Sequence, residues 1–130
     1  MDPFRPPATG AGPARILLVD DDPLLREFAC VHLATPDVML DTAVSGAEAL
    51  ERIETGGFDL VLVGGAMPDM GAAAFITALR QSERAPIPAV VVTDGDNPEE
   101  IDAAFVAGAT SFLVKPLNPR IFPQQLRFIL

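Results

Sequence analysis

Carboxylates and a single lysine are the residues of this sequence best suited to chemistry. Three consecutive aspartates, Asp20, Asp21 and Asp22, follow an apolar run, and clustered carboxylates are typical ligands of a hard cation such as magnesium. Lys115 is the only lysine of the chain, and its compact ammonium group suits contact with a phosphoryl oxygen or a carboxylate. Thr93 adds a hydroxyl group after another apolar run. These residue types predict a site for a divalent cation or a phosphoryl group.

Five short apolar runs, separated by helix patterns, have to position these residues. The runs are continuous rather than alternating, which is typical of strands buried on both faces. They are Arg15–Asp20, Val38–Val44, Phe58–Val63, Ile87–Thr93 and Ser111–Val114. Strict alternation of strands and helices predicts an α/β fold with one doubly wound parallel sheet. Ligands of such sheets bind beyond the carboxyl ends of the strands, where the aspartates, the threonine and the lysine all fall.

Capping residues predict where the helices begin. Asp22 precedes a proline, Ser45 precedes a glutamate by three residues, and Asn97 precedes a second proline. Each pattern is typical of a helix N-terminus. The last helix contains Pro123, which predicts a kink or a late start near Phe122 because an internal proline removes a backbone hydrogen bond.

Length and composition predict one acidic domain. Residues 1–14 carry four prolines and two glycines without periodicity, so we interpret them as a disordered leader before a domain at 15–130. The net charge of -9 argues against binding to nucleic acid. No apolar run reaches the roughly 18 residues of a membrane-spanning helix, and no signal peptide is evident. We therefore expect a cytoplasmic protein that binds neither nucleic acid nor membrane.

Five sequence blocks carry a resemblance to a known family. In chain order they read ILLVDDDPLLREF, SGAEALERI, FDLVLVGGAMPDM, IPAVVVTDGD and GATSFLVKPLNP. Together they resemble the receiver domain of response regulators, from about residue 15 to the end of the chain. The resemblance implies a flavodoxin-like fold with five helices and five strands in the order 2-1-3-4-5. It also implies a role in bacterial two-component or phosphorelay signalling, in which a histidine kinase passes a phosphoryl group to an aspartate.

The resemblance implies metal ligands and shows three departures, one of which is Gly71-Ala72 in place of the usual Asp-Gly before the third helix. Asp20 and Asp21 correspond to the acidic pair that holds magnesium. The acceptor aspartate is expected three residues before the Met-Pro pair, and that position holds Gly64. Since glycine has no carboxylate, an acyl phosphate cannot form there, and magnesium loses one ligand. Asp94 stands where the family prefers a small residue, and it either faces water or adds a carboxylate to a cation site. We expect a degenerate receiver with no catalytic residue and weak or absent magnesium binding.

Four other residues match the pocket of the family. Thr93 corresponds to the hydroxyl that turns toward the phosphoryl group, and Phe112 to the aromatic residue coupled to it. Lys115 corresponds to the lysine that contacts the phosphorylated carboxylate, and the bond before Pro116 to a cis peptide bond. We interpret these residues as remnants of a receiver pocket. We expect the lysine to pair with the first or second aspartate of the triplet, because adjacent carboxylates repel one another.

The last helix predicts a protein-binding surface. If its regularly spaced apolar residues face the core, the outer side carries Ile121, Phe128, Arg120 and Arg127. In receivers this region is the usual surface for partners or dimers. We therefore expect a protein-protein interaction module, with a histidine kinase or a second copy of the chain as the candidate partner.

Two alternative functions use the same aspartates. In the first, the phosphoryl group moves to a neighbouring carboxylate, Asp20 or Asp21. In the second, Asp20 and Asp22 form an Asp-x-Asp motif that resembles the phosphatases of the haloacid dehalogenase family. Those enzymes also need a late acidic pair, which is absent after Lys115. The chain is therefore not expected to be an enzyme.

Overall fold

The computed structural model describes residues 14–20, 22–33, 38–64, 67, 69–81, 87–115, 117–127 and 129. Within these residues, strands and helices alternate along the chain, and the strands pair in parallel to form one sheet. The strands are β1 (Ala14–Val19), β2 (Val38–Ala43), β3 (Leu60–Gly64), β4 (Ala89–Thr93) and β5 (Ser111–Val114). Their order in the sheet is β2-β1-β3-β4-β5, so the predicted fold class and strand order are confirmed.

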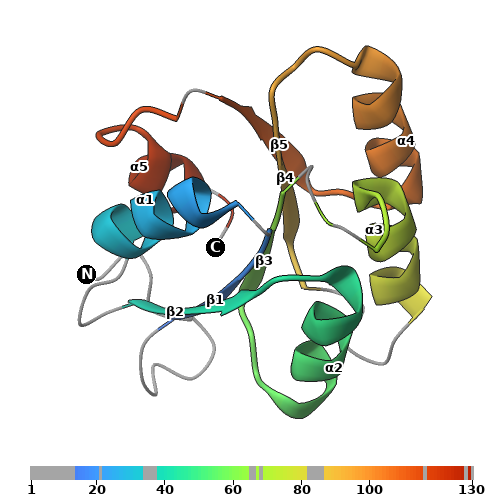
Figure 1. Cartoon of the computed structure of the whole chain (residues 1–130), viewed down its shortest axis with the longest axis horizontal. Helices are drawn as coiled ribbons and strands as arrows, with labels where there is room; N and C mark the ends of the chain where they lie inside the picture. Colours follow the sequence, from blue (N-terminus) through green and yellow to red (C-terminus); the bar gives the residue numbers. More distant parts are fainter. Residues whose placement is uncertain are drawn as a thin grey trace.

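Helices cover both faces of this sheet (Figure 1). Those of the described residues are α1 (Pro23–Leu33), α2 (Gly46–Thr55), α3 (Ala72–Gln81), α4 (Pro98–Ala107) and α5 (Phe122–Arg127). Helices α1 and α5 lie on one face, and α2, α3 and α4 lie on the other (Figure 1). Throughout the described ranges, no helix combines the length and the apolarity that crossing a membrane requires.

Alternate residues of β1 point into two separate cores. Leu17 and Val19 pack with α2, α3 and α4, whereas Ile16 and Leu18 pack with α1 and α5. All four side chains are fully buried. Burial of one such side chain contributes roughly 1.5–3 kcal/mol to folding. The central strand is therefore held firmly from both sides, and its carboxyl end is a fixed point for the residues that follow.

The prediction that every strand is buried on both faces is confirmed for the centre of the sheet and is wrong for its edges. Every residue of β3 is buried. On the edge strand β5, Phe112 is 39% exposed and Val114 is 48% exposed, and Met39 on the other edge strand is 50% exposed. An edge strand has a neighbour on one side only, and the flanking helices cover it incompletely.

Several predicted boundaries shift by one or two residues. Strand β1 begins at Ala14, one residue before the predicted start of the domain, and the rest of the predicted leader lies outside the described residues. Strands β3 and β4 each begin two residues later than predicted, at Leu60 and Ala89. Helix α5 begins at Phe122, which confirms the predicted late start, and Pro123 falls in its first turn.

The predicted capping residues occupy the expected helix ends. The Asp22 carboxylate accepts a hydrogen bond from the Leu24 N–H at 2.9 Å at the start of α1. Ser45 Oγ accepts from the Glu48 N–H at the start of α2, and the Asn97 carboxamide oxygen accepts from the first turn of α4. Such caps satisfy N–H groups that have no partner within the helix. Each cap follows a strand closely, so it also orients the loop at the carboxyl edge of the sheet.

Candidate functional site

The ends of β1 and β3 place Asp20 opposite Gly64. The two strands pair in register up to Val19 and Val63, so the next residues of both strands are neighbours. The Asp20 side chain is fully buried, and its Oδ1 accepts a hydrogen bond from the Asp22 N–H at 2.9 Å. It faces the α-carbon of Gly64, where a longer residue would begin its side chain. The first aspartate of the triplet is therefore turned into the sheet edge rather than toward solvent.

Lys115 pairs with Asp22. Its Nζ lies 3.9 Å from Asp22 Oδ2, while Oδ1 of the same carboxylate caps α1. The predicted pairing of this lysine with Asp20 is wrong, because the ion pair is made with Asp22. The physical reason is that Asp20 is buried beside Gly64, whereas Asp22 stands at the cap before α1, opposite the lysine. The alternative pairing with Asp21 stays a prediction. The side chain of Asp21 lies outside the described residues.

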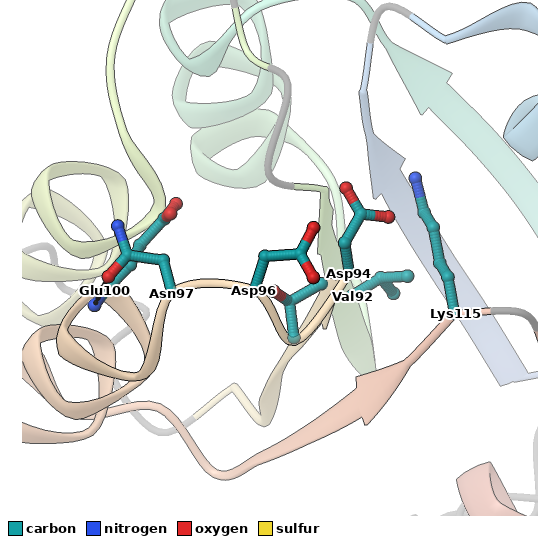
Figure 2. Close-up of a pocket in the computed structure, with 7 residues that line it drawn as sticks. Val92, Asp94, Asp96, Asn97, Glu100 and Lys115 are labelled. Atoms are coloured by element: carbon teal, nitrogen blue, oxygen red, sulfur yellow. Dashed lines mark hydrogen bonds between the residues drawn. The ribbon is translucent and has the colours of Figure 1, made fainter.

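A small polar pocket of about 170 Å³ opens at the end of β4 (Figure 2). Its lining consists of Val92, Thr93, Asp94, Asp96, Asn97, Glu100 and Lys115. In Figure 2 the charged ends of Asp94 and Lys115 point to the same side, and Glu100 lies on the opposite wall. Thr93 Oγ1 accepts a hydrogen bond from the Gly95 N–H at 3.1 Å, so its hydroxyl is engaged in the loop before α4. Three acidic side chains against one lysine give this pocket a negative charge.

A second, more apolar hollow of about 490 Å³ lies beside the first, between α1 and the segment after β5. Its apolar lining is Leu24, Leu25, Phe28 and Leu117, and it shares Asp94 and Lys115 with the polar pocket. The sequence analysis missed this hollow. The sequence signal for this hollow is Leu24, an apolar residue directly after Pro23. In the structure the Leu24 side chain is 75% exposed, so it is not part of the core.

Phe112 lies on the outer side of the edge strand rather than in the pocket. Its ring contacts the ring of Phe105 on α4 edge to face, with 5.7 Å between centroids and an angle of 86°. Both rings are about two-fifths exposed, at 39% and 40%. Ile121, which precedes α5, is 49% exposed, and Arg120 is exposed as well. Pro116, Phe128 and the side chain of Arg127 lie outside the described residues.

Known sequences and structures share this architecture over nearly the whole chain. The family model of the response regulator receiver domain matches residues 16–127. The chain belongs to this family. The solved chemotaxis response regulator CheY4 of Vibrio cholerae superposes on the receiver with a TM-score of 0.84 and 30% sequence identity, covering 91% of this chain and 99% of that one.

Curated relatives of this receiver come from several kingdoms. Transcription factor prr1 of Schizosaccharomyces pombe is 32% identical over 113 residues, which are 87% of this chain and 21% of that protein. The two-component response regulator ORR1 of Oryza sativa subsp. japonica is 32% identical over 122 residues, covering 85% of this chain and 53% of that protein. The chain therefore spans about a fifth of the first relative and about half of the second.

Of the two expected magnesium ligands, Asp20 is described and Asp21 lies outside the described residues. Magnesium prefers near-octahedral oxygen coordination with one or two protein carboxylates. Here Asp20 is buried against Gly64 and holds the Asp22 N–H, while the carboxylate of Asp22 caps a helix and faces Lys115. Position 64 contributes no carboxylate. Within the described ranges, no three acidic, histidine or cysteine side chains cluster in a way that could hold a metal ion.

Asp69 makes a contact between two loops that the sequence analysis missed. Its two carboxylate oxygens accept hydrogen bonds from the N–H groups of Gly46 and Ala47, at 2.9 and 3.0 Å. These two bonds, the first being the stronger influence, lower the pKa of Asp69 below its usual value. The contact joins the loop after β3 to the start of α2. Only the three-dimensional approach of two loops creates it, so no local pattern predicts it.

Arg80 is the second residue that the sequence analysis missed. Its guanidinium donates to the carbonyl of Gly108 from Nε at 3.1 Å and from Nη2 at 2.8 Å. A third bond runs from Nη1 to the carbonyl of Ile87 at 2.7 Å. Burial lowers the pKa of Arg80, yet an arginine keeps its charge in proteins. The side chain thereby connects the end of α3 to the end of α4 and to the entry into β4.

Proposed function

We propose that this receiver domain acts in two-component signalling as a binding module that is not phosphorylated at the usual acceptor position. The observation that carries the proposal is Gly64 at the carboxyl end of β3. Family resemblance assigns the acceptor aspartate to this position, and an acyl phosphate needs a side-chain carboxylate. The site around it supports the same function, because Lys115 contacts Asp22 and Thr93 contacts the Gly95 amide.

We propose further that magnesium binds weakly or not at all and that the domain catalyses no reaction. The family ligands present are Asp20 and Asp21, and the first of these is buried with its Oδ1 holding a backbone amide. A phosphatase built on Asp20 and Asp22 would need both carboxylates directed at one substrate. Here the Asp22 carboxylate caps α1 and faces Lys115. These contacts support the proposal that the domain is not an enzyme.

The proposed binding surface comprises α4, β5 and the start of α5, and we call it the α4–β5–α5 face. Its exposed apolar side chains are Phe105, Val106, Phe112, Val114 and Ile121. Val106 is 89% exposed, so its apolar surface is almost entirely in water. Exposed apolar groups that gather on one face are typical of a protein-binding site. Binding there would cover these apolar groups.

We propose a second copy of the chain as the occupant of this face, with a histidine kinase as the alternative. The face carries acidic groups on α4, among them Glu99 and Asp102, and the basic Arg120 before α5. A two-fold dimer places the same surface on both subunits, so such a face can satisfy its own charges. We also expect the domain to work in the cytoplasm, as predicted from the sequence.

Phosphoryl transfer from a small phosphodonor tests the central statement. The chain is incubated with acetyl phosphate and magnesium, and its intact mass is measured, beside a receiver that keeps an aspartate at this position. The expected result is an added phosphoryl group on the control and none on this chain. A phosphoryl adduct on this chain that disappears in Asp20→Asn or Asp21→Asn would instead establish phosphorylation of a neighbouring carboxylate.

Sedimentation equilibrium tests the proposed partner. The expected result is a concentration-dependent dimer that dissociates when Ile121 is replaced by serine. A chain that stays monomeric at high concentration, yet binds a purified histidine kinase through the same residue, would assign the α4–β5–α5 face to the kinase. Self-association that is unchanged by substitutions on this face would contradict the proposed surface.

A further inference from the structure

We propose that Asp20 and Gly64 compete for the same space in this chain, where the Asp20 side chain occupies the position at which a side chain of residue 64 would begin. The inference rests on the proposed function in that it concerns the same acceptor position. It adds that this position is filled from within the chain. Replacing the glycine alone would therefore not restore a receiver site.

The geometry of the two strand ends carries this inference. A Cβ atom built on Gly64 would lie 2.8 Å from the Cβ of Asp20 and closer still to its Cγ and Oδ2. Contacts below 3.0 Å are essentially never made by real Cβ atoms. Rotation about χ1 would move the carboxylate of Asp20 away, but it would leave the Asp20 Cβ where it is. Relief of the contact therefore requires the ends of β1 and β3 to move apart.

Moving the strand ends apart would cost free energy, because several contacts hold Asp20 in place. Its side chain is fully buried, its Oδ1 accepts from the Asp22 N–H, and its own N–H donates to the carbonyl of Ala43 at 3.0 Å. The preceding residue, Val19, is paired with strands on both sides. A side chain at position 64 would strain this network, because closely packed interiors tolerate little added volume.

Other glycines of the chain provide a comparison. A Cβ atom on Gly46 would also be crowded, at 2.6 Å from Met70 Sδ, but the flexible end of the Met70 side chain can move away. A Cβ atom built on Gly57 or Gly71 meets nothing within 4 Å. Neither of these residues has a positive φ angle, and the positive-φ glycines of the described chain are Gly95 and Gly108. Gly57 lies in an exposed loop before β3, which makes it a matched control for a glycine-to-alanine substitution.

A thermal double-mutant cycle tests the pair. Melting temperatures are measured for the unmodified chain, Gly64→Ala, Asp20→Gly and the double variant Asp20→Gly/Gly64→Ala, with Gly57→Ala as control. We expect Gly64→Ala to lower the melting temperature by about 5 °C or more in the presence of Asp20. In the Asp20→Gly background the same alanine should cost less than half as much, since the crowded atoms are gone. The control should melt within about 2 °C of the unmodified chain.

A graded third background separates crowding by the carboxylate from crowding by the Cβ atom. Asp20→Ala removes Cγ and both oxygens but keeps the Cβ that lies 2.8 Å away. Gly64→Ala should therefore have an intermediate cost there. If Gly64→Ala alone does not fold, recovery of folded protein in the Asp20→Gly background supports the pair, and failure in both backgrounds overturns it.

The outcome that overturns the inference is additivity. If alanine at position 64 costs the same with and without Asp20, the two residues do not compete for space. This readout is independent of phosphorylation. A phosphoryl adduct on the unmodified chain would contradict the proposed function without affecting the cycle, and an additive cycle would contradict the pair without affecting the labelling result.

Discussion

The polar residues beyond the carboxyl ends of β1 and β5 differ from the α4–β5–α5 face in what they contact. Beyond these strand ends, polar side chains contact one another and the backbone: the Asp20 carboxylate accepts from the Asp22 N–H, and Asp22 lies opposite Lys115. On the face, Val106 and Ile121 extend into water. Asp20 and Lys115 thus contact groups within the chain, whereas the apolar side chains of the α4–β5–α5 face are exposed. We infer that the molecule signals by its surface.

Removing Arg80, whose hydrogen bonds hold the end of α4, should have the largest effect of the changes considered, a loss of stability. Arg80→Met keeps the length of the side chain but loses the three bonds to the carbonyls of Gly108 and Ile87. We expect the free energy of unfolding to fall by about 2 kcal/mol, measured by urea denaturation. Arg80→Lys, which keeps the charge with fewer donors in place, should fall between the two. An unchanged midpoint for the methionine variant would show that α4 does not depend on this contact.

Replacing exposed apolar residues of the α4–β5–α5 face should weaken self-association without destabilising the fold. We expect the double variant Val106→Ser/Ile121→Ser to weaken self-association by about tenfold, or about 1.4 kcal/mol. Its free energy of unfolding should stay within about 0.5 kcal/mol, because both side chains are exposed. Sedimentation and urea denaturation measure the two effects. Cys30→Ser, an exposed position on α1, is the control that should change neither.

Breaking the ion pair in the pocket should have a smaller effect. Lys115→Met removes the contact with Asp22, and both side chains are partly exposed, at 29% and 35%. We expect a loss of less than about 1 kcal/mol in the free energy of unfolding, since solvent screens such pairs. Self-association through the α4–β5–α5 face should not change. A strong loss of self-association would show that the pocket and the face are coupled.

The smallest effect should be the pH dependence that Asp69 introduces. Because its pKa is lowered in the folded chain, Asp69 stabilises the fold above its unfolded pKa, and this stabilisation is lost as the pH falls through the lowered folded value. Asp69→Asn should therefore melt slightly below the unmodified chain at neutral pH. The two melting temperatures should converge in strong acid, where the carboxylate is protonated. Parallel melting curves across the whole acidic range would contradict this assignment.

The fold was predictable because each strand packs against the core and therefore consists mainly of apolar residues, which stand out in the sequence. Apolar runs located β1 through β5, but they misplaced the starts of β3 and β4. Phe58 precedes β3 and is buried because it belongs to the core on the side of α2, α3 and α4, and the guanidinium of Arg15 lies 4.6 Å from the centre of its ring. An apolar residue can thus enter the core from a loop. Sequence patterns indicate burial more directly than they indicate backbone conformation.

The site was predictable as a set of positions but not as a set of contacts. Spacing placed Asp20, Thr93 and Lys115 at one edge of the sheet. It did not identify which aspartate the lysine faces, since that depends on how Asp20 packs against Gly64. The bonds from Arg80 to Gly108 and from Gly46 to Asp69 join segments that are separated by more than twenty residues, and no short motif records such contacts.

The contacts of Arg80 also set α4 between two regions of the molecule. The guanidinium holds the carboxyl end of this helix through the Gly108 carbonyl, while the first turn, at Pro98, follows the exposed cap of Asn97. Asn97 and Glu100 form a wall of the acidic pocket, and Val106 at the other end of the helix is exposed. One helix thus carries part of the acidic wall and part of the proposed binding face.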